Sequence, residues 1–111
     1  MLQWHKIAES LNEIAFAENN IAEVSADNKT ICIAKFNEQV FACAHKCPHA
    51  SGLFIEGYID AVGNVVCPIH RYKFRLKDGR NVTGEGYFLK VYPIEIREDG
   101  IYVGMEKSWW Q

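Results

Sequence analysis

The sequence predicts an all-β fold, a small antiparallel sandwich or barrel, on three observations. Apolar and polar residues alternate along several short segments, which is the period of half-buried strands. Turn-forming residues separate these segments. Of the 111 residues, 49% are hydrophobic and 23% are charged, which supplies a core without low-complexity bias. We therefore expect one domain spanning residues 1–111.

The elements follow from the pattern in chain order. Residues 7–18 have weak helical spacing and predict at most one short helix or turn. The first clear strands are 30–36 and 39–44, which Asn37-Glu38 joins as a hairpin. Later strands are expected at 65–66, 72–76, 88–96 and 101–103, with turns at Asp78-Gly79 and Asp99-Gly100. The segment 45–70 shows no hairpin pattern, and it holds the residues that carry chemistry.

Charge and hydropathy argue against two classes of partner. Twelve basic and fourteen acidic residues give a net charge of −2, so no overall positive charge favours nucleic acid. No apolar run approaches the roughly 18 residues of a membrane span. The N-terminus lacks a basic stretch followed by an apolar one, so no signal peptide is predicted and the cytoplasm is the expected location.

Two short segments each combine a cysteine with a histidine. Cys47-Pro48-His49 is followed, after seventeen residues, by Cys67-Pro68-Ile69-His70. Without a secretory signal, the cysteines favour a metal site over disulfides, and thiolate with imidazole suits Zn²⁺ or an iron–sulfur centre. Zinc sites usually take two Cys from one arm and two His from the other. Mixed arms suit a centre with two metal atoms, because each loop can then bring one ligand of each kind.

This spacing resembles the signature of Rieske [2Fe–2S] proteins, Cys-x-His followed by Cys-x₂-His, in which two His replace two Cys on one iron. The similarity covers roughly residues 30–106. It includes Cys-Pro-His-Ala-Ser-Gly at 47–52, Val-Cys-Pro-Ile-His at 66–70, the closing strands at 89–97 and 101–103, and Gly57, Phe74 and Gly79. The resemblance implies one [2Fe–2S] cluster bound by Cys47, His49, Cys67 and His70. It also implies a two-loop cluster-binding subdomain at about 45–75, inserted in the all-β domain.

A second Cys-x-His, Cys43-Ala44-His45, ends an apolar strand and lacks the Pro-x-x-x-Gly that follows Cys47. We therefore expect Cys43 and Cys32 to be small core residues. His45 is expected in a loop beside the cluster, and His5 at the surface.

The chain departs from the Rieske proteins of quinol-oxidising complexes, which share an extra Cys in each loop and a Ser and a Tyr after the last His. Ile69 stands at the second-loop Cys position, and Tyr72 and Phe74 stand where those proteins have Ser and Tyr. Phe74 cannot donate a hydrogen bond to sulfur, so we expect a potential near the low end, roughly −150 mV. Small Rieske ferredoxins often cover the cluster with a Pro-containing loop. Here residues 81–86 contain no Pro, and Gly84 and Gly86 would form the equivalent cap.

The resemblance implies an electron carrier and not an enzyme, because 111 residues leave no room for the mononuclear-iron domain of a terminal ring-hydroxylating oxygenase. The expected partners are a flavin reductase as donor and a terminal Rieske oxygenase of a dioxygenase system as acceptor. The first alternative is the small Rieske subunit of an NAD(P)H-dependent nitrite reductase. The second is a structural module that holds Zn at the same four residues.

Two surface features have two interpretations each. The basic residues Arg71, Lys73, Arg75 and Lys77 alternate with apolar residues, so they form either a solvated strand face or a basic patch that steers an acidic partner. Trp109-Trp110 either packs on the barrel or contacts a partner.

Overall fold

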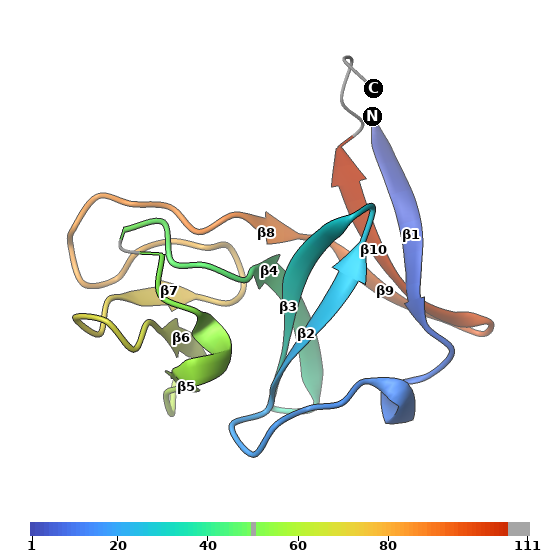
Figure 1. The fold of residues 1–111 in the computed structure, drawn as a ribbon, viewed down its shortest axis with the longest axis horizontal. Helices are drawn as coiled ribbons and strands as arrows, with labels where there is room; N and C mark the ends of the chain where they lie inside the picture. Colours follow the sequence, from blue (N-terminus) through green and yellow to red (C-terminus); the bar gives the residue numbers. More distant parts are fainter. Residues whose placement is uncertain (50, 107–111) are drawn as a thin grey trace.

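The computed structural model describes residues 1–49 and 51–106, in which the regular elements are strands and two short 3₁₀ turns (Figure 1). The strands are β1 (Leu2–Ala8), β2 (Ile21–Ala26), β3 (Lys29–Phe36), β4 (Gln39–Ala44), β5 (Tyr58–Ile59), β6 (Asn64–Val66), β7 (Lys73–Arg75), β8 (Val91–Tyr92), β9 (Ile94–Arg97) and β10 (Gly100–Glu106). The 3₁₀ turns are η1 (Leu11–Glu13) and η2 (Phe54–Glu56). The described residues contain no α-helix, and the all-β prediction is confirmed. No helix in this part of the chain is long and apolar enough to cross a membrane.

Three antiparallel sheets follow one another across the molecule (Figure 1). The terminal sheet has the order β1-β10-β9, the central sheet β2-β3-β4-β8, and the small sheet β5-β6-β7. The chain changes from the central to the terminal sheet at Pro93, between β8 and β9. Trp109 and Trp110 lie outside the described residues.

Two tight hairpins build the central sheet. Asn37-Glu38 joins β3 to β4 with both residues at positive φ (50° and 62°), as a two-residue turn of type I′ requires. Asp27-Asn28 joins β2 to β3 in the same way (50° and 61°), a hairpin that the strand pattern did not predict.

The short helix or turn expected within residues 7–18 is present as the 3₁₀ turn η1, but the segment before it is a strand that the sequence did not predict. Residues 7 and 8 belong to β1, which pairs with β10 from Leu2 opposite Glu106 to Ala8 opposite Ile101. Only the single turn η1 remains of the helical spacing. Strand pairing with β10 satisfies the backbone of this segment, and that pairing outweighs a weak local preference.

Both faces of the central sheet are buried. Ile31 and Ile33 of β3 pack with Val103 of the terminal sheet, and each is at most 1% exposed. On the opposite face, Cys32 packs in a second core with Phe54 and other residues of the segment that holds the small sheet. Full burial of one such aliphatic side chain stabilises the folded state by roughly 1.5–3 kcal/mol. The central sheet is therefore a stable base for the segment that packs against it.

The small sheet and the two cysteine-containing loops form one insert between β4 and β8, which are neighbours in the central sheet. The N–H of Ala44 donates to the carbonyl of Lys90 at 2.9 Å, so the two ends of the insert meet. The insert lies on the left of Figure 1, with the terminal sheet on the right.

Candidate metal centre

The two loops have matching backbone closures. The N–H of Cys47 donates to the carbonyl of Gly52 at 2.8 Å, and the N–H of Cys67 donates to the carbonyl of Tyr72 at 3.0 Å. Each closure therefore joins a cysteine to the residue five positions later. The cysteine stands at the base of its loop, and the histidine two or three residues later stands in the turn.

Three residues of these loops that are not glycine adopt left-handed backbone. Ser51 has φ 59°, and the adjacent His70 and Arg71 have φ 61° and 58°. Such conformations cost roughly 1–3 kcal/mol each and persist where surrounding structure enforces them. Strained backbone of this kind gathers at ligand sites, and here it coincides with the two loops.

The two thiols lie together inside the protein. Cys47 is 2% exposed and Cys67 is fully buried. Burial raises the pKa of the Cys67 thiol; the N–H of Ile69 acts in the opposite direction, and a hydrogen bond with Cys47 adds to the increase. Gly52 provides the room for this pair, because a Cβ atom there would lie 2.8 Å from Sγ of Cys67.

The two imidazoles lie nearer the surface. Their ring centroids are 5.5 Å apart with an interplanar angle of 62°. His49 is half-buried and His70 is exposed. Nδ1 of His49 is buried and has no hydrogen-bond partner in the described part of the chain, a condition that costs about 1–3 kcal/mol unless a ligand satisfies the atom. A buried imidazole nitrogen without a partner, two residues after the buried Cys47, fits a bound metal cluster.

Two tyrosines complete the surroundings of His49. The Tyr72 ring centroid lies 4.3 Å from that of His49, and the Tyr87 ring centroid lies 5.3 Å away. The sequence analysis placed Tyr72 in an expected strand and compared it with a hydrogen-bonding Ser, but it did not predict its contact with His49 and missed Tyr87. The signal for Tyr87 was its place directly after the 81–86 stretch, which was expected to form a cap.

The structure places the Cys47 thiol against that of Cys67 and the His49 ring beside that of His70, and the joint ligand set of all four stays a prediction. Cys43 faces Cys32 across β3 and β4, both are 1% exposed, and their assignment as core residues is confirmed. The hydrogen bond with Cys32, together with burial, raises the pKa of the Cys43 thiol well above its usual value. The expectation for His5 is corrected, because it is half-buried on β1 with Nε2 inaccessible to solvent.

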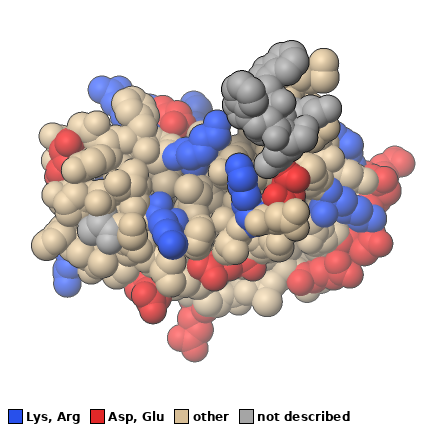
Figure 2. Space-filling model, turned by 45° about the horizontal axis from the view of Figure 1, so that its top comes forward, with Lys and Arg blue, Asp and Glu red and all other residues tan. Residues whose placement is uncertain are grey.

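The basic residues after His70 are partly neutralised. Lys73 Nζ lies 3.5 Å from Oδ2 of Asp60, and Arg75 forms an ion pair with Asp78. Phe74 between them is buried, as the solvated-face interpretation expects. Figure 2 shows Lys and Arg side chains over the middle of one face of the molecule and a mostly uncharged area toward its left end.

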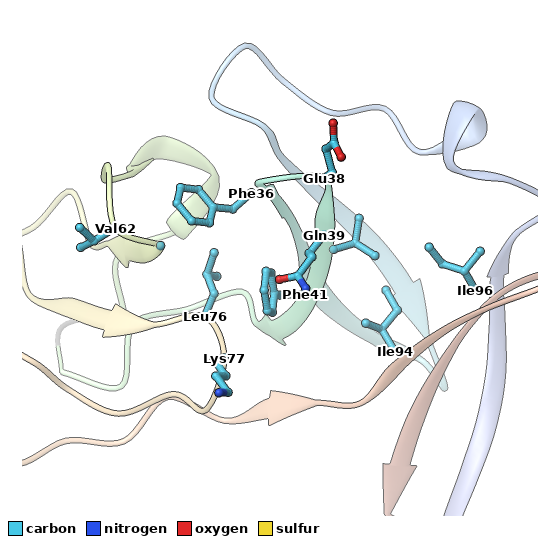
Figure 3. A pocket seen from close by; sticks show the side chains of 11 residues that line it. Phe36, Glu38, Gln39, Phe41, Val62, Leu76, Lys77, Ile94 and Ile96 are labelled. Carbon is cyan, nitrogen blue, oxygen red and sulfur yellow. The ribbon is translucent and has the colours of Figure 1, made fainter.

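A groove of about 660 Å³ lies apart from the four motif residues, none of which lines it (Figure 3). Its walls come from β4, β9 and the turns around Gly63 and Lys77, and they include Phe36, Phe41 and Leu76. The lining residues contain no Cys or His, so the groove adds no group to the candidate centre.

Comparisons with known proteins agree with this geometry. A family described as the Rieske-like [2Fe–2S] domain matches residues 3–104. The anthranilate 1,2-dioxygenase ferredoxin subunit of Burkholderia cepacia is 27% identical over 109 residues, covering 95% of this chain and 94% of the relative. The 3-phenylpropionate/cinnamic acid dioxygenase ferredoxin subunit of Photorhabdus laumondii is 28% identical over 79 residues, covering 70% and 75%.

Among solved structures, a putative NADH-dependent nitrite reductase small subunit from Mycobacterium tuberculosis superposes with a TM-score of 0.78. It is 20% identical, and the alignment covers 97% of this chain and 99% of that one, which shows a shared fold. The curated relatives are ferredoxin subunits, that is, electron-transfer components and not catalytic subunits, and the corresponding prediction is confirmed. Because the family match spans almost the whole sequence, the chain belongs to the family of Rieske-like [2Fe–2S] domains.

Proposed function

We propose that Cys47, His49, Cys67 and His70 hold one [2Fe–2S] cluster and that the protein carries single electrons from a flavin reductase to a terminal Rieske oxygenase. One observation carries the proposal: two loops with matching closures place two neighbouring thiols inside the protein and two imidazoles 5.5 Å apart nearer the surface. The names of the two curated relatives, both ferredoxin subunits of dioxygenases, support the direction of electron flow.

The residues have distinct parts in this proposal. Cys47 and Cys67 would bind one iron, and burial excludes water from their side chains. The N–H of Ile69 donates toward Sγ of Cys67 and stabilises negative charge there. His49 and His70 would bind the other iron, and the exposed His70 would be the ligand that a partner protein can reach. When bound, the cluster supplies one-electron transfer without bond formation to a substrate.

The arrangement favours a dinuclear cluster over the zinc alternative. A structural zinc site needs four side chains that converge on one ion. Among residues 1–49 and 51–106, no group of three or more His, Cys, Asp or Glu side chains converges in that way. A dinuclear cluster instead needs one pair of side chains at each metal atom, which the thiol pair and the imidazole pair would supply.

The fold likeness to the Mycobacterium tuberculosis protein favours a second candidate, the small Rieske subunit of a nitrite reductase. The ligand set and the cytoplasmic location that we propose are the same in both cases. The two candidates differ in the partner protein, a reductase and oxygenase pair in one case and a sirohaem-containing large subunit in the other.

The deciding experiment is EPR of the purified protein after dithionite reduction. A rhombic signal with an average g below that of all-Cys [2Fe–2S] ferredoxins supports the proposal, and a colourless protein with stoichiometric Zn contradicts it. Cys67→Ser and His70→Gln should abolish the signal. Cys43→Ala and His45→Gln are matched controls from the second Cys-x-His sequence and should retain it.

The partner is tested by NADH-driven turnover. The protein is mixed either with the flavin reductase and oxygenase of a ring-hydroxylating system or with a nitrite reductase large subunit. Turnover only in the first mixture supports the carrier function, and turnover only with nitrite moves the protein to the second candidate.

A further inference from the structure

The two histidines of the proposed centre have unequal surroundings. His49 is half-buried, with the Tyr72 and Tyr87 rings 4.3 and 5.3 Å from its own and Nδ1 out of contact with solvent. The Tyr72 and Tyr87 rings are themselves stacked, with centroids 6.2 Å apart and an angle of 28°. His70 is exposed, and Tyr72 is 6.2 Å from it. Aromatic rings therefore cover the His49 side more closely than the His70 side.

Tyr87 reaches His49 from a loop that one side chain organises. Nδ2 of Asn81 donates to the Lys73 carbonyl at 3.2 Å, to Oγ1 of Thr83 at 3.1 Å and to Oε1 of Glu85 at 2.9 Å. Oδ1 of Asn81 accepts from the N–H of Glu85 at 2.6 Å and of Gly86 at 3.3 Å. These contacts use both donors and the acceptor of the amide, so Asn81 holds the start and the end of the loop together.

The loop depends on these hydrogen bonds because packing contributes little to it. Gly84 and Gly86 have φ 88° and 86°, and a Cβ atom on either would meet nothing within 4 Å. The start of the loop is attached to β7, where Asn81 pairs with Phe74 and the N–H of Val82 donates to the Lys73 carbonyl at 3.0 Å. Hydrogen bonds of Asn81 thus fix the direction in which Tyr87 leaves the loop.

We propose that Tyr87, held by Asn81, closes the His49 side of the centre to water, so that the centre meets solvent and its partners through His70. This inference rests on the proposed function, since it concerns the environment of the cluster. Tyr87 and Asn81 are positioning residues, because Tyr87 acts through His49 and Asn81 acts through Tyr87. Reduction adds one negative charge, which water stabilises better than aromatic rings do, so the cover lowers the reduction potential.

The test compares Tyr87→Ala and Asn81→Ala with the unmodified holoprotein in two measurements. The first is the reduction potential. The second is the deuterium modulation in pulsed EPR of the reduced cluster after exchange into D₂O, which reports exchangeable hydrogen near the metal atoms. Both variants should raise the potential and deepen the modulation. Tyr87→Phe keeps the ring and should leave both measurements unchanged.

Phe88→Ala is the matched control, because Phe88 follows Tyr87 in the chain and is 74% exposed. It should give the values of the unmodified protein. The proposal is wrong if Tyr87→Ala leaves both measurements unchanged, or if Phe88→Ala alters them equally. If Asn81→Ala leaves the reduction potential and the deuterium modulation unchanged, Asn81 does not position Tyr87. If Asn81→Ala does not fold, the result for Tyr87→Ala alone decides the proposal. Absence of a Rieske EPR signal in the unmodified protein would instead refute the proposed function.

Discussion

Gly52 lies directly against Sγ of Cys67, so that a Cβ atom at position 52 would be 2.8 Å from the sulfur. The contact joins the first loop to the second at the level of the buried thiols. The carbonyl of Gly52 also accepts the hydrogen bond from Cys47 that closes the first loop. The missing side chain at position 52 therefore leaves the room that Sγ of Cys67 occupies beside the first loop.

Gly52→Ala should reduce the amount of cluster that the protein binds. The added methyl must displace the sulfur of Cys67 or the side chain of Ile69, and overpacking of this kind costs about 1–3 kcal/mol. Iron and sulfide content per protein and the visible absorbance of the cluster measure the effect. Gly84→Asn is the control, because position 84 is open and Asn tolerates its left-handed backbone. Full cluster content in Gly52→Ala would contradict the prediction.

The reduction potential should be close to −150 mV, near the lower limit of about −150 to +300 mV for Rieske centres. Phe74 is fully buried and offers no hydroxyl, and the Tyr72 ring packs on His49. Phe74→Tyr should raise the potential by about 60 mV if the new hydrogen bond is about 1.4 kcal/mol stronger in the reduced state. Protein-film voltammetry measures both values. A clearly positive reduction potential in the unmodified protein would show that other hydrogen-bond donors replace the hydroxyl that Phe74 lacks.

Arg71→Glu should slow reduction by the flavin reductase, most strongly at low ionic strength. Arg71 is exposed beside His70, and the ion pairs in the described residues leave it free, whereas Lys73 and Arg75 are paired with carboxylates. Exposed charges act over about 10 Å at 0.1 M salt, so the effect should fade as salt is added. Lys77→Glu makes the same charge change beside the groove and should have little effect. Equal slowing by both variants would point to overall charge as the cause.

Asp60→Asn should destabilise the protein at neutral pH by about 1–2 kcal/mol. Burial alone would raise the pKa of Asp60, but hydrogen bonds from Asn64 and Val62 and the charge of Lys73 together lower it. A lowered pKa in the folded state adds stability above the unfolded value of about 3.9, and this stability is lost as the pH falls through the lowered pKa.

Thermal unfolding of the holoprotein from pH 7 to pH 3 tests this dependence, and the two proteins should converge toward acid pH. Asp27→Asn is the control, because Asp27 occupies a left-handed hairpin position that Asn adopts equally well. A stability difference that is constant with pH would mean that the Asp60 carboxylate acts through shape and not through charge.

The sequence predicted those parts of the fold that depend on local pattern. The hairpin at Asn37-Glu38 follows from two alternating segments and a turn, whereas the ligand set that the resemblance to Rieske proteins implied stays a prediction. β1 was missed because it is an edge strand of which only Ala8 is buried, so its residues carry no clear alternation.

The side chains around His49 could not be predicted from local sequence pattern, for a different reason. Tyr87 lies 38 positions from His49 in the sequence, and their contact depends on the path of the 81–86 loop. The hydrogen bonds of Asn81 set that path. An asparagine in a loop is common, so its residue type alone does not indicate that it holds the loop together. The boundaries of the cluster-binding subdomain, 45–75, stay a prediction.

The meeting of Ala44 and Lys90 makes the candidate centre one continuous insertion in the central sheet. Both loops, the small sheet and the Tyr87 cover lie within one continuous stretch that leaves and re-enters the central sheet on adjacent strands. The rest of the protein meets this stretch through the apolar surface around Cys32 and Cys43 and through Asn19, whose Nδ2 donates to the carbonyls of Ile55 and Gly57.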